Sequence, residues 1–324
     1  MFPLFLLQLS FEDFFGEQTY YYIRNNGNRI IETPEQYVFV ENCAFYSLSS
    51  LNGGAIYLSS TTGNLYVTTS LFNNCSATDS YGAVYYQVIN SGVVFDKTCA
   101  YHCYSSYGLE KFGQFGIGYV NSNNYNAFQL VSIALCSPFS AHSSCAFRFY
   151  GGKQMCLNSN SSKNKVYRHS GIDFTEGNTY QAKYITLSDN VVGGWTALMV
   201  YGINGNIDYC NFCRNNSPDS RGVFIFGASD TRMSNCVFLN NMDVLFDSRA
   251  DCSYFGIINC FIDNYNYINS APYTSNIASF ITQTLPLTHY QSADCYAQIK
   301  FLINTNKLAD HHSVSSFILT LFIL

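Results

Sequence analysis

Charge is scarce in this sequence. Charged residues make up 11% of the 324 positions, against ~25% in an average soluble protein. The formal net charge is −5, the pI is near 5.6, and no stretch concentrates lysine or arginine. A nucleic-acid surface requires a basic face, and anionic membranes attract clusters of basic residues. The composition therefore excludes nucleic acid as the expected partner and shows no basic membrane patch.

The sequence also lacks the pattern of a helical protein. Apolar residues do not recur at the 3.6-residue period of an amphipathic helix, and no apolar run reaches the ~20 residues of a membrane span. The apolar ends, "MFPLFLLQL" and "SSFILTLFIL", are both shorter than that. We interpret residues 1–30 as a signal-like or capping segment and residues 271–324 as a C-terminal cap with an apolar tail. Membrane attachment stays open.

Cysteine, asparagine and aromatic residues are abundant instead. The chain has 13 Cys, 33 Asn, 27 Tyr and 27 Phe. This aromatic content predicts a packed core, and so many cysteines are typical of a secreted protein rather than a reduced cytosolic one. Because 13 is odd, at least one thiol is expected to stay free or to pair between chains. Three sequons would accept N-glycans in a secreted chain; they begin at Asn74, Asn160 and Asn215.

One short segment recurs along the chain at a spacing near 25 residues. Seven examples align on an aromatic or aliphatic residue, usually two positions after a cysteine: "VENCAF", "VTTSLF", "DKTCAY", "AKYITL", "NIDYCNF", "RMSNCVF" and "GIINCFI". In four units a glycine then leads into a second apolar run: "GGAIYL", "GAVYY", "GGWTALMV" and "GVFIF". A recurrence of this length without a helical period predicts a solenoid of short strands.

The recurrence assigns structural roles to particular residues. Alternate residues of a strand face the same side, so the cysteine and the aromatic should both point inward and stack from unit to unit. The predicted core column consists of Cys43, Phe45, Phe72, Cys99, Tyr101, Cys210, Phe212, Cys236, Phe238 and Cys260. The glycines are predicted to turn the chain with positive φ; they are Gly53, Gly54, Gly82, Gly193, Gly194 and Gly222.

Asparagine recurs three residues after the inward residue. It occupies this place at positions 190, 215 and 241, and Cys75 occupies it once. Stacked asparagines can hydrogen-bond along a β array, so we predict an asparagine ladder at one corner of the coil. Between residues 102 and 186 the rhythm is weaker. There we expect further coils with longer insertions, whose register the sequence does not define.

The motifs resemble those of a known family. "GGAI" at 53–56, with "FCRN" at 212–215 and "FLNN" at 238–241, is similar to the GGA[ILV] and FxxN repeats of polymorphic outer-membrane proteins. The "NCxF" variant especially resembles surface proteins of this type in parasitic protozoa. The resemblance covers roughly residues 38–265 and implies a right-handed parallel β-helix, a secreted or surface location, and a role in adhesion. Only one unit carries the full GGAI, and the membrane barrel of the bacterial members has no counterpart here.

These features predict a single all-β domain, a right-handed parallel β-helix. It would contain roughly nine or ten coils of ~25 residues each, over residues 31–270. Open coils expose unpaired strand edges, so segments 1–30 and 271–324 are expected to cover the two ends.

A polysaccharide-degrading enzyme is the alternative, because pectate lyases and polygalacturonases share this fold. Such enzymes use clustered carboxylates, either to hold calcium or as an acid–base pair. Here the acidic residues are scattered, and the nearest group is Asp243, Asp247 and Asp251. The sequence contains neither an Asp-Asp pair nor a Gly-His-Gly segment. We therefore expect no catalytic residues and no enzymatic activity.

Two segments have the spacing of zinc ligands, "CAYHC" at 99–103 and "CNFC" at 210–213. They lie more than 100 residues apart, and each begins with a cysteine that the repeat already explains. We interpret them as an inward thiol followed by a loop cysteine, and expect no metal or cofactor.

The function predicted from the sequence is therefore binding. We expect a non-enzymatic, secreted or cell-surface protein that presents an extended face to an extracellular ligand, either a glycan or a cell-surface protein. Repeat proteins bind in this way, with contacts distributed over successive units. A third possibility is a family member that has lost its activity.

Overall fold

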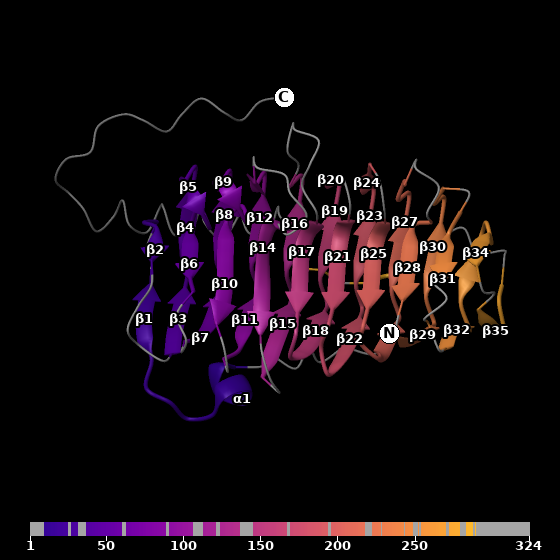
Figure 1. Ribbon diagram of the computed structural model, residues 1–324, viewed down its shortest axis with the longest axis horizontal. Coiled ribbons are helices and arrows are strands. Elements are labelled where there is room, and N and C mark those ends of the chain that lie inside the picture. Colours follow the sequence, from indigo (N-terminus) through magenta and orange to yellow (C-terminus); the bar gives the residue numbers. More distant parts are fainter. Residues whose placement is uncertain are drawn as a thin grey trace.

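The chain is wound into a parallel β-solenoid (Figure 1). The computed structural model describes residues 10–24, 27–31, 37–59, 63–88, 91–105, 113–120, 124–136, 145–166, 169–193, 196–217, 222–227, 229–242, 244–248, 252, 254–269, 272–278, 283–287 and 289. Only the backbone is described at 80, 88, 113–119, 145, 169–170 and 268–269. The predicted fold class, an all-β solenoid of parallel strands, is confirmed.

Three long parallel sheets form the walls of the solenoid. The A sheet has 11 strands: β1 (Tyr21–Arg24), β3 (Tyr37–Glu41), β7 (Asn64–Thr68), β11 (Val93–Asp96), β15 (Tyr125–Gln129), β18 (Lys153–Leu157), β22 (Thr179–Lys183), β26 (Gly205–Asp208), β29 (Asp230–Ser234), β32 (Tyr254–Ile258) and β35 (Tyr273–Ser275). The B sheet has 10: β2 (Ile30–Ile31), β6 (Ile56–Leu58), β10 (Val84–Val88), β14 (Gly113–Val120), β17 (Cys145–Tyr150), β21 (His169–Thr175), β25 (Thr196–Tyr201), β28 (Phe224–Gly227), β31 (Phe246–Ser248) and β34 (Tyr267–Asn269). The C sheet has nine: β4 (Ala44–Tyr46), β8 (Leu71–Asn73), β12 (Cys99–Tyr101), β16 (Ser132–Ala134), β19 (Asn160–Ser162), β23 (Thr186–Ser188), β27 (Asn211–Cys213), β30 (Val237–Leu239) and β33 (Phe261–Ile262).

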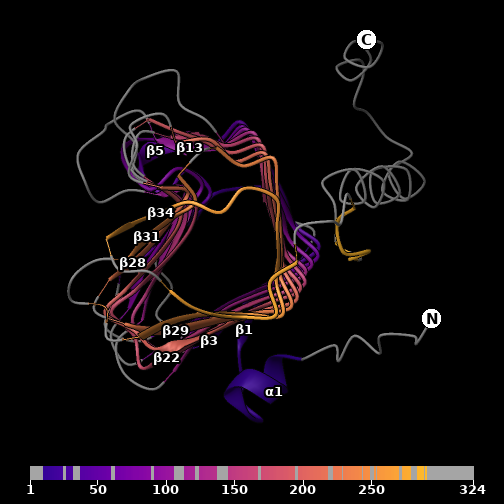
Figure 2. The same ribbon diagram turned by 90° about the vertical axis from the view of Figure 1, so that its right-hand side faces the viewer.

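Two small sheets extend this frame. One joins β5 (Ser49–Asn52), β9 (Ser76–Ser80) and β13 (Tyr104–Ser105), and the other joins β20 (Lys165–Val166) and β24 (Val191–Val192). Viewed along the axis, the coils superpose closely, and the first small sheet bulges outward between the C and B walls (Figure 2). Strands of the weakly repetitive region 102–186 enter the same three sheets, as expected for further coils.

Two corners of each coil are formed by residues in the left-handed region, where φ lies between 45° and 56°. Between the A and C sheets they are Asn42, Thr69, Lys97, Leu130, Asn158, Tyr184, Tyr209, Asn235, Asn259 and Asn276. After the C sheet they are Ser47, Asn74, His102, Leu135, Lys163, Asp189, Arg214 and Asn240. Asparagine tolerates this conformation better than most residues, which explains the asparagine before cysteine in "NCAF", "NCVF" and "NCFI".

In seven of the ten first corners described, the next residue carries a small hydrogen-bond donor; after Leu130, Tyr184 and Asn276 it is aliphatic. Ser70 Oγ, for example, donates to the Thr68 carbonyl at 2.8 Å. The same bond, to the carbonyl two residues earlier, is donated by Cys43, Thr98, Ser159, Cys210, Cys236 and Cys260. The recurring cysteine therefore does more than fill space. The thiols of Cys210, Cys236 and Cys260 each add a second hydrogen bond to a buried carbonyl that already accepts the corner N–H of the preceding coil.

The predicted asparagine ladder is present and includes one more residue than predicted, Asn164. Each amide Nδ2 donates to the Oδ1 of the asparagine in the next coil, at 3.1, 3.0 and 3.1 Å along the series Asn164, Asn190, Asn215 and Asn241. In the three preceding coils the same place is held by Cys75, Cys103 and Cys136. Burial raises the pKa of the Cys103 thiol well above its usual range, so this thiol stays protonated and can donate.

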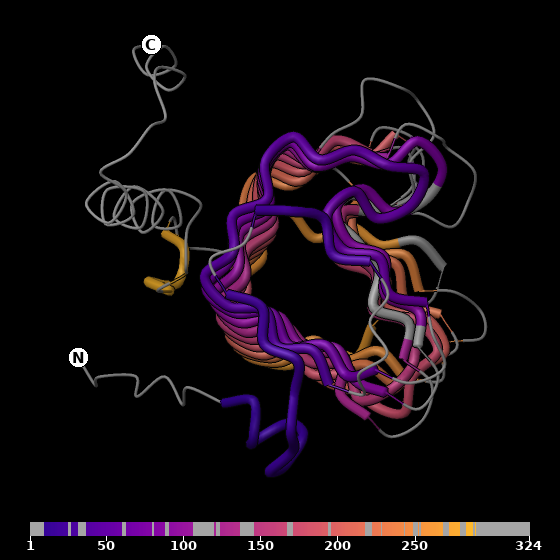
Figure 3. Tube along the Cα trace, turned by 90° about the vertical axis from the view of Figure 1, so that its left-hand side faces the viewer, coloured from indigo at the N-terminus to yellow at the C-terminus, as the bar shows by residue number. Residues whose placement is uncertain are grey.

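The N-terminal segment lies on the side of the solenoid. The helix α1 (Phe11–Phe15) packs Phe11 against Tyr66 and Val94 on the outer face of the A sheet, and Figure 3 shows it outside the ring. Strands run from Tyr21 to Ser275, beyond the predicted boundaries at 31 and 270. The boundaries were missed because the first and last strands pair on one side only and carry exposed tyrosines in place of the inward pattern.

Candidate binding face on the B sheet

The register brings most of the predicted core column together. Phe45 stacks on Phe72, and Phe212 on Phe238, each pair with ring centroids 4.9 Å apart and planes at 22°. Between the two pairs the column contains Ala100, Ile133, Ser161 and Leu187. The cysteines two residues earlier, Cys43, Cys210, Cys236 and Cys260, are all buried.

Cys99 and Tyr101 do not lie in this column, and their assignment to it is wrong. Lys97 forms the corner in this coil, so Thr98 takes the place of the cysteine and Ala100 that of the aromatic. Both predicted residues shift by one and lie on the outer side of the C sheet. There Cys99 is buried and disulfide-bonded, whereas Tyr101 is half exposed.

The predicted turn glycines serve two purposes. Gly53 and Gly222 have the expected positive φ, 50° and 94°. Other described members do not adopt it, and the prediction of positive φ is wrong for Gly54, Gly82 and Gly193. Gly54 is required instead by close approach of two backbones, because a Cβ there would overlap the Ser76 carbonyl oxygen. Gly194 lies outside the described residues.

The three sequon asparagines occupy different environments. Asn215 is a ladder residue with 1% of its surface exposed, so an N-glycan there is incompatible with this fold and that assignment is wrong. Asn160 is half buried in β19, and its Oδ1 is fully enclosed. Asn74 is exposed at a left-handed corner. Of the three, only Asn74 presents its side chain to solvent.

The two segments with zinc-like spacing do not converge. His102 is exposed at a corner while Cys103 points inward, and Cys213 lies on the outer side of the C sheet, buried against Leu285. Across the described ranges, no three or more His, Cys, Asp or Glu side chains are close enough together to hold a metal ion.

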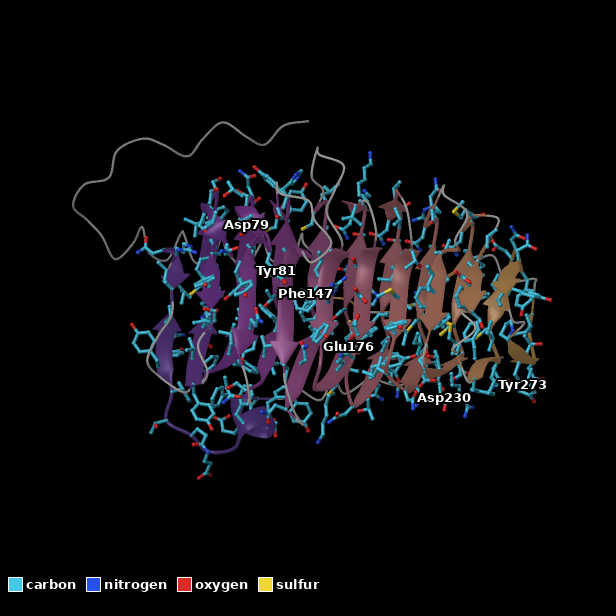
Figure 4. The ribbon with its side chains drawn as sticks, viewed as in Figure 1. Asp79, Tyr81, Phe147, Glu176, Asp230 and Tyr273 are labelled. Carbon is cyan, nitrogen blue, oxygen red and sulfur yellow. The ribbon has the colours of Figure 1, made fainter. Side chains whose placement is uncertain are left out.

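The outer face of the B sheet carries an unusual column of side chains. Among the residues whose side chains are described, the register stacks one outward residue from each strand, in the order Ile31, Tyr57, Tyr85, Arg148, Asp173, Met199, Ile225 and Asp247. The backbone of β14 lies between Tyr85 and Arg148 in this order. A second outward column two residues later contains Gln87, Tyr150, Thr175 and Tyr201. This face looks toward the viewer in Figure 4, where Tyr81 and Glu176 mark its two edges.

A tyrosine cluster lies at the N-terminal end of this face. The rings of Tyr57 and Tyr85 are stacked, with centroids 5.1 Å apart and planes at 14°, and Tyr81 packs on Tyr85 at 4.8 Å. The Arg29 guanidinium lies 5.8 Å from the centre of the Tyr57 ring and donates to the Asn52 carbonyl at 2.7 Å. Because the rings stack along the axis, their edges and hydroxyl groups face outward.

Polar neighbours orient these hydroxyl groups. Ser59 Oγ donates to the Tyr57 hydroxyl oxygen at 3.1 Å, and the Tyr85 hydroxyl donates to Gln87 Oε1. Burial raises the pKa of Tyr85, so its hydroxyl stays protonated at neutral pH. The cluster therefore presents neutral donors and acceptors, repeated from coil to coil, on a half-buried aromatic base.

The carboxylates of this face are widely separated. Arg148 Nε donates to Asp173 Oδ2 at 2.7 Å, and Thr175 Oγ1 donates to Oδ1 of the same carboxylate at 2.6 Å. Asp247 lies three strands further along the column, which is about 14 Å at ~4.8 Å per strand. The carboxyl pairs of glycoside hydrolases are about 5–9.5 Å apart, so these two are not spaced as such a pair.

The fold and this face define the class of the protein as a parallel β-solenoid with a neutral, tyrosine-bearing outer wall. No protein-family profile, no curated protein and no solved structure gives a significant match to the chain. In the described part of the chain, no helix has the length and hydrophobicity needed to cross a membrane.

One buried carboxyl group should make stability depend on pH. Asp96 ends β11 with 2% of its surface exposed, and burial raises its pKa to about 6. Because the folded pKa exceeds the unfolded one, the native state loses stability as the pH rises from about 4 to about 6. The variant Asp96→Asn should lack this loss. Its unfolding free energy relative to the wild type should rise by up to about 3 kcal/mol between pH 4 and pH 7, measured by urea unfolding. A difference that does not change with pH would contradict the assignment.

Proposed function

We propose that this protein is a non-enzymatic, secreted or cell-surface solenoid that binds an extended, hydroxyl-rich glycan along the outer face of the B sheet. The observation that carries the proposal is the Tyr57–Tyr85 stack, whose hydroxyl groups are held by Ser59 and Gln87. A chain of sugar hydroxyls offers the complementary donors and acceptors at repeated intervals, and a solenoid presents matching groups at each coil.

The proposal also covers the location of the protein and the repeat family to which it is related. The high cysteine content, the disulfide at Cys99 and the exposed sequon at Asn74 support passage through an oxidising compartment. The FxxN segments supply the inward aromatic and the ladder asparagine, for example Phe212 and Asn215. We therefore propose kinship with the polymorphic outer-membrane type of repeat, with a right-handed coil.

The test is binding to a panel of soluble oligosaccharides of plant, microbial and animal cell-surface type, measured by array and then by calorimetry. The double variant Tyr57→Phe/Tyr85→Phe keeps the ring stack and removes only the hydroxyls. Two lost hydrogen bonds of about 1 kcal/mol each should weaken binding roughly 10- to 30-fold.

The matched control is Tyr184→Phe/Tyr209→Phe, which alters a second tyrosine pair, 5.6 Å apart at the corner between the A and C sheets. It should leave affinity unchanged. Absence of binding across the whole panel, or equal losses in both double variants, would reject this site.

A polysaccharide lyase or glycoside hydrolase is the second candidate, favoured by the buried Arg148–Asp173 pair on the same face. Both oxygens of Asp173 already accept hydrogen bonds from neighbouring side chains, so binding without cleavage is the better-supported function. Release of reducing ends from a bound glycan, abolished by Asp173→Asn, would decide for the enzyme.

A further inference from the structure

Asn211, on the outer face of the C sheet, binds a peptide group of the C-terminal segment. The Leu285 backbone N–H donates to Asn211 Oδ1 at 2.8 Å, and the Leu285 carbonyl accepts from Asn211 Nδ2 at 3.0 Å. The segment 283–287 is seen outside the ring in Figures 2 and 3. One side-chain amide therefore pairs with both backbone groups of one residue, as a neighbouring strand would.

An apolar cluster beside Asn211 receives the side chain of the same leucine. Leu285 packs on four outward residues of the C sheet, each at most 8% exposed: Cys213, Val237, Leu239 and Phe261. Burial raises the pKa of the Cys213 thiol to about 11, so this thiol is uncharged at neutral pH and contributes apolar surface. Backbone pairing of this kind supplies affinity, and the surface that holds the side chain supplies specificity.

Thr186 connects the contact at Leu285 with a second one. It is the register partner of Asn211 in the preceding coil. Its Oγ1 accepts from Asn211 Nδ2 at 3.5 Å and lies 2.6 Å from His289 Nε2. Burial lowers the pKa of His289, so the imidazole is neutral at pH 7 and forms a neutral hydrogen bond with the hydroxyl. The C face therefore holds this part of the chain through polar groups of two successive coils.

The sequence of the segment favours the bound shape. The Leu287 backbone N–H donates to the Leu285 carbonyl at 2.8 Å, which closes a three-residue turn around Pro286. Proline fixes its own φ and keeps the preceding residue extended. Because less freedom is lost on binding, a leucine followed by proline suits this face.

The link to the solenoid is long enough for the segment to reach a second molecule. Ala278 lies in the same column as Asn211, three strands closer to the C-terminal end, which is about 14 Å at ~4.8 Å per strand. The seven residues from Ala278 to Leu285 can span up to about 24 Å. The segment can therefore reach its own site or the equivalent site of a copy lying alongside.

We propose that this face of the C sheet is a peptide-binding site for an extended leucine–proline segment, and that Leu285 of a second copy of this chain can occupy it in place of the resident one. Two copies would then exchange their C-terminal segments and form a dimer by domain swapping. The site lies on a different wall from the proposed glycan face, so either proposal can fail without the other.

The first test is binding of a labelled peptide with the sequence of residues 283–289 to the full chain, measured by fluorescence anisotropy. In the variant Leu285→Asp the resident segment no longer fits the apolar cluster. This variant should bind the peptide at least ~10-fold more tightly than the wild type, in which the resident segment competes within the same molecule. Equal affinity for the two proteins, or binding to neither, would overturn the site.

Two further changes in the Leu285→Asp variant locate the bound peptide. Adding Asn211→Ala removes both backbone hydrogen bonds and should weaken binding roughly 10- to 30-fold. The matched change Asn206→Ala alters an exposed asparagine of β26 on the A sheet and should leave the affinity unchanged. Equal losses from the two changes would reject Asn211 as the backbone contact.

A change in the peptide gives the same information without altering the protein. Aspartate in place of the leucine that corresponds to Leu285 should weaken binding about 10- to 100-fold, because that side chain no longer buries apolar surface. An unchanged affinity would overturn the role of the apolar cluster.

Mixing two variants tests the second copy as the occupant. Leu285→Asp offers a site without a matching segment, whereas Asn211→Ala offers the segment with a weakened site. Each variant alone should sediment as a monomer at a concentration where their equimolar mixture forms a heterodimer. A mixture that stays monomeric although the peptide binds, or a dimer of either variant alone, would overturn the exchange between copies.

Discussion

Replacing Asn215 by alanine is expected to lower the free energy of unfolding by about 3–5 kcal/mol. The Asn215 amide donates to the Leu187 carbonyl at 2.9 Å and to Asn241 Oδ1 at 3.1 Å. Its own oxygen accepts from the Asn190 backbone N–H and side-chain amide, at 3.3 and 3.0 Å. Alanine would leave groups on both neighbouring coils buried without partners, and urea unfolding followed by circular dichroism would measure the loss.

The adjacent exposed residue provides the control. Asn216→Ala keeps the sequon that begins at Asn215 and removes a solvent-facing side chain, so it should change stability by less than about 0.5 kcal/mol. Hydrogen exchange adds a local readout, because the Asn190 amide should lose protection in Asn215→Ala alone. Similar stability of the two variants would show that the ladder contributes little to folding.

Gly151→Ala is expected to destabilise the protein by a similar amount, about 3–5 kcal/mol. Gly151 turns the chain from the B sheet to the A sheet with φ of 74°, a conformation that costs an alanine ~1–2 kcal/mol. In addition, its new Cβ would overlap the carbonyl oxygen of Val120 in the preceding coil. Backbone would have to move to relieve that clash, and thermal melting would report the loss.

The same corner two coils further along contains the matched control. Gly202 is two coils from Gly151 in the same register, with Glu176 between them, and all three have positive φ. A Cβ at Gly202 would have no heavy atom closer than 3.6 Å, so Gly202→Ala should cost only the ~1–2 kcal/mol of backbone strain. Equal losses at the two glycines would mean that the contact with Val120 adjusts freely.

Sequence reasoning found the features that repeat exactly. The stacking of Phe212 on Phe238 and the ladder through Asn190 and Asn215 follow from a constant spacing in an in-register parallel array. The error at Cys99 came from the same source. "DKTCAY" has the same spacing as "VENCAF", but Thr98 forms the corner hydrogen bond that a cysteine forms in other coils. Thr98 and Ala100 therefore occupy the inward positions, one residue before Cys99 and Tyr101.

Other features could not be found from spacing. Leucine at 130 and lysine at 97 adopt the left-handed corner as readily as Asn42 does, because neighbouring coils fix the turn whatever the residue. The candidate site depends on residues from different coils, such as Arg148 and Asp173, whose proximity requires the correct register.

The asparagine ladder also bears on how this molecule could change in length. Asn190 and Asn215 meet the same groups above and below, an amide on each side and the carbonyl of the inward residue one coil before. A duplicated coil inserted between them could therefore form all of these hydrogen bonds with its neighbours. Deletion of a coil would leave no ladder group without a hydrogen-bond partner. The coils that carry Cys75, Cys103 or Cys136 at this position have only one weak side-chain donor each. They therefore cannot replace an asparagine coil in the ladder. Duplication and loss are therefore easiest in the C-terminal half, and close relatives of this chain should differ in coil number there first.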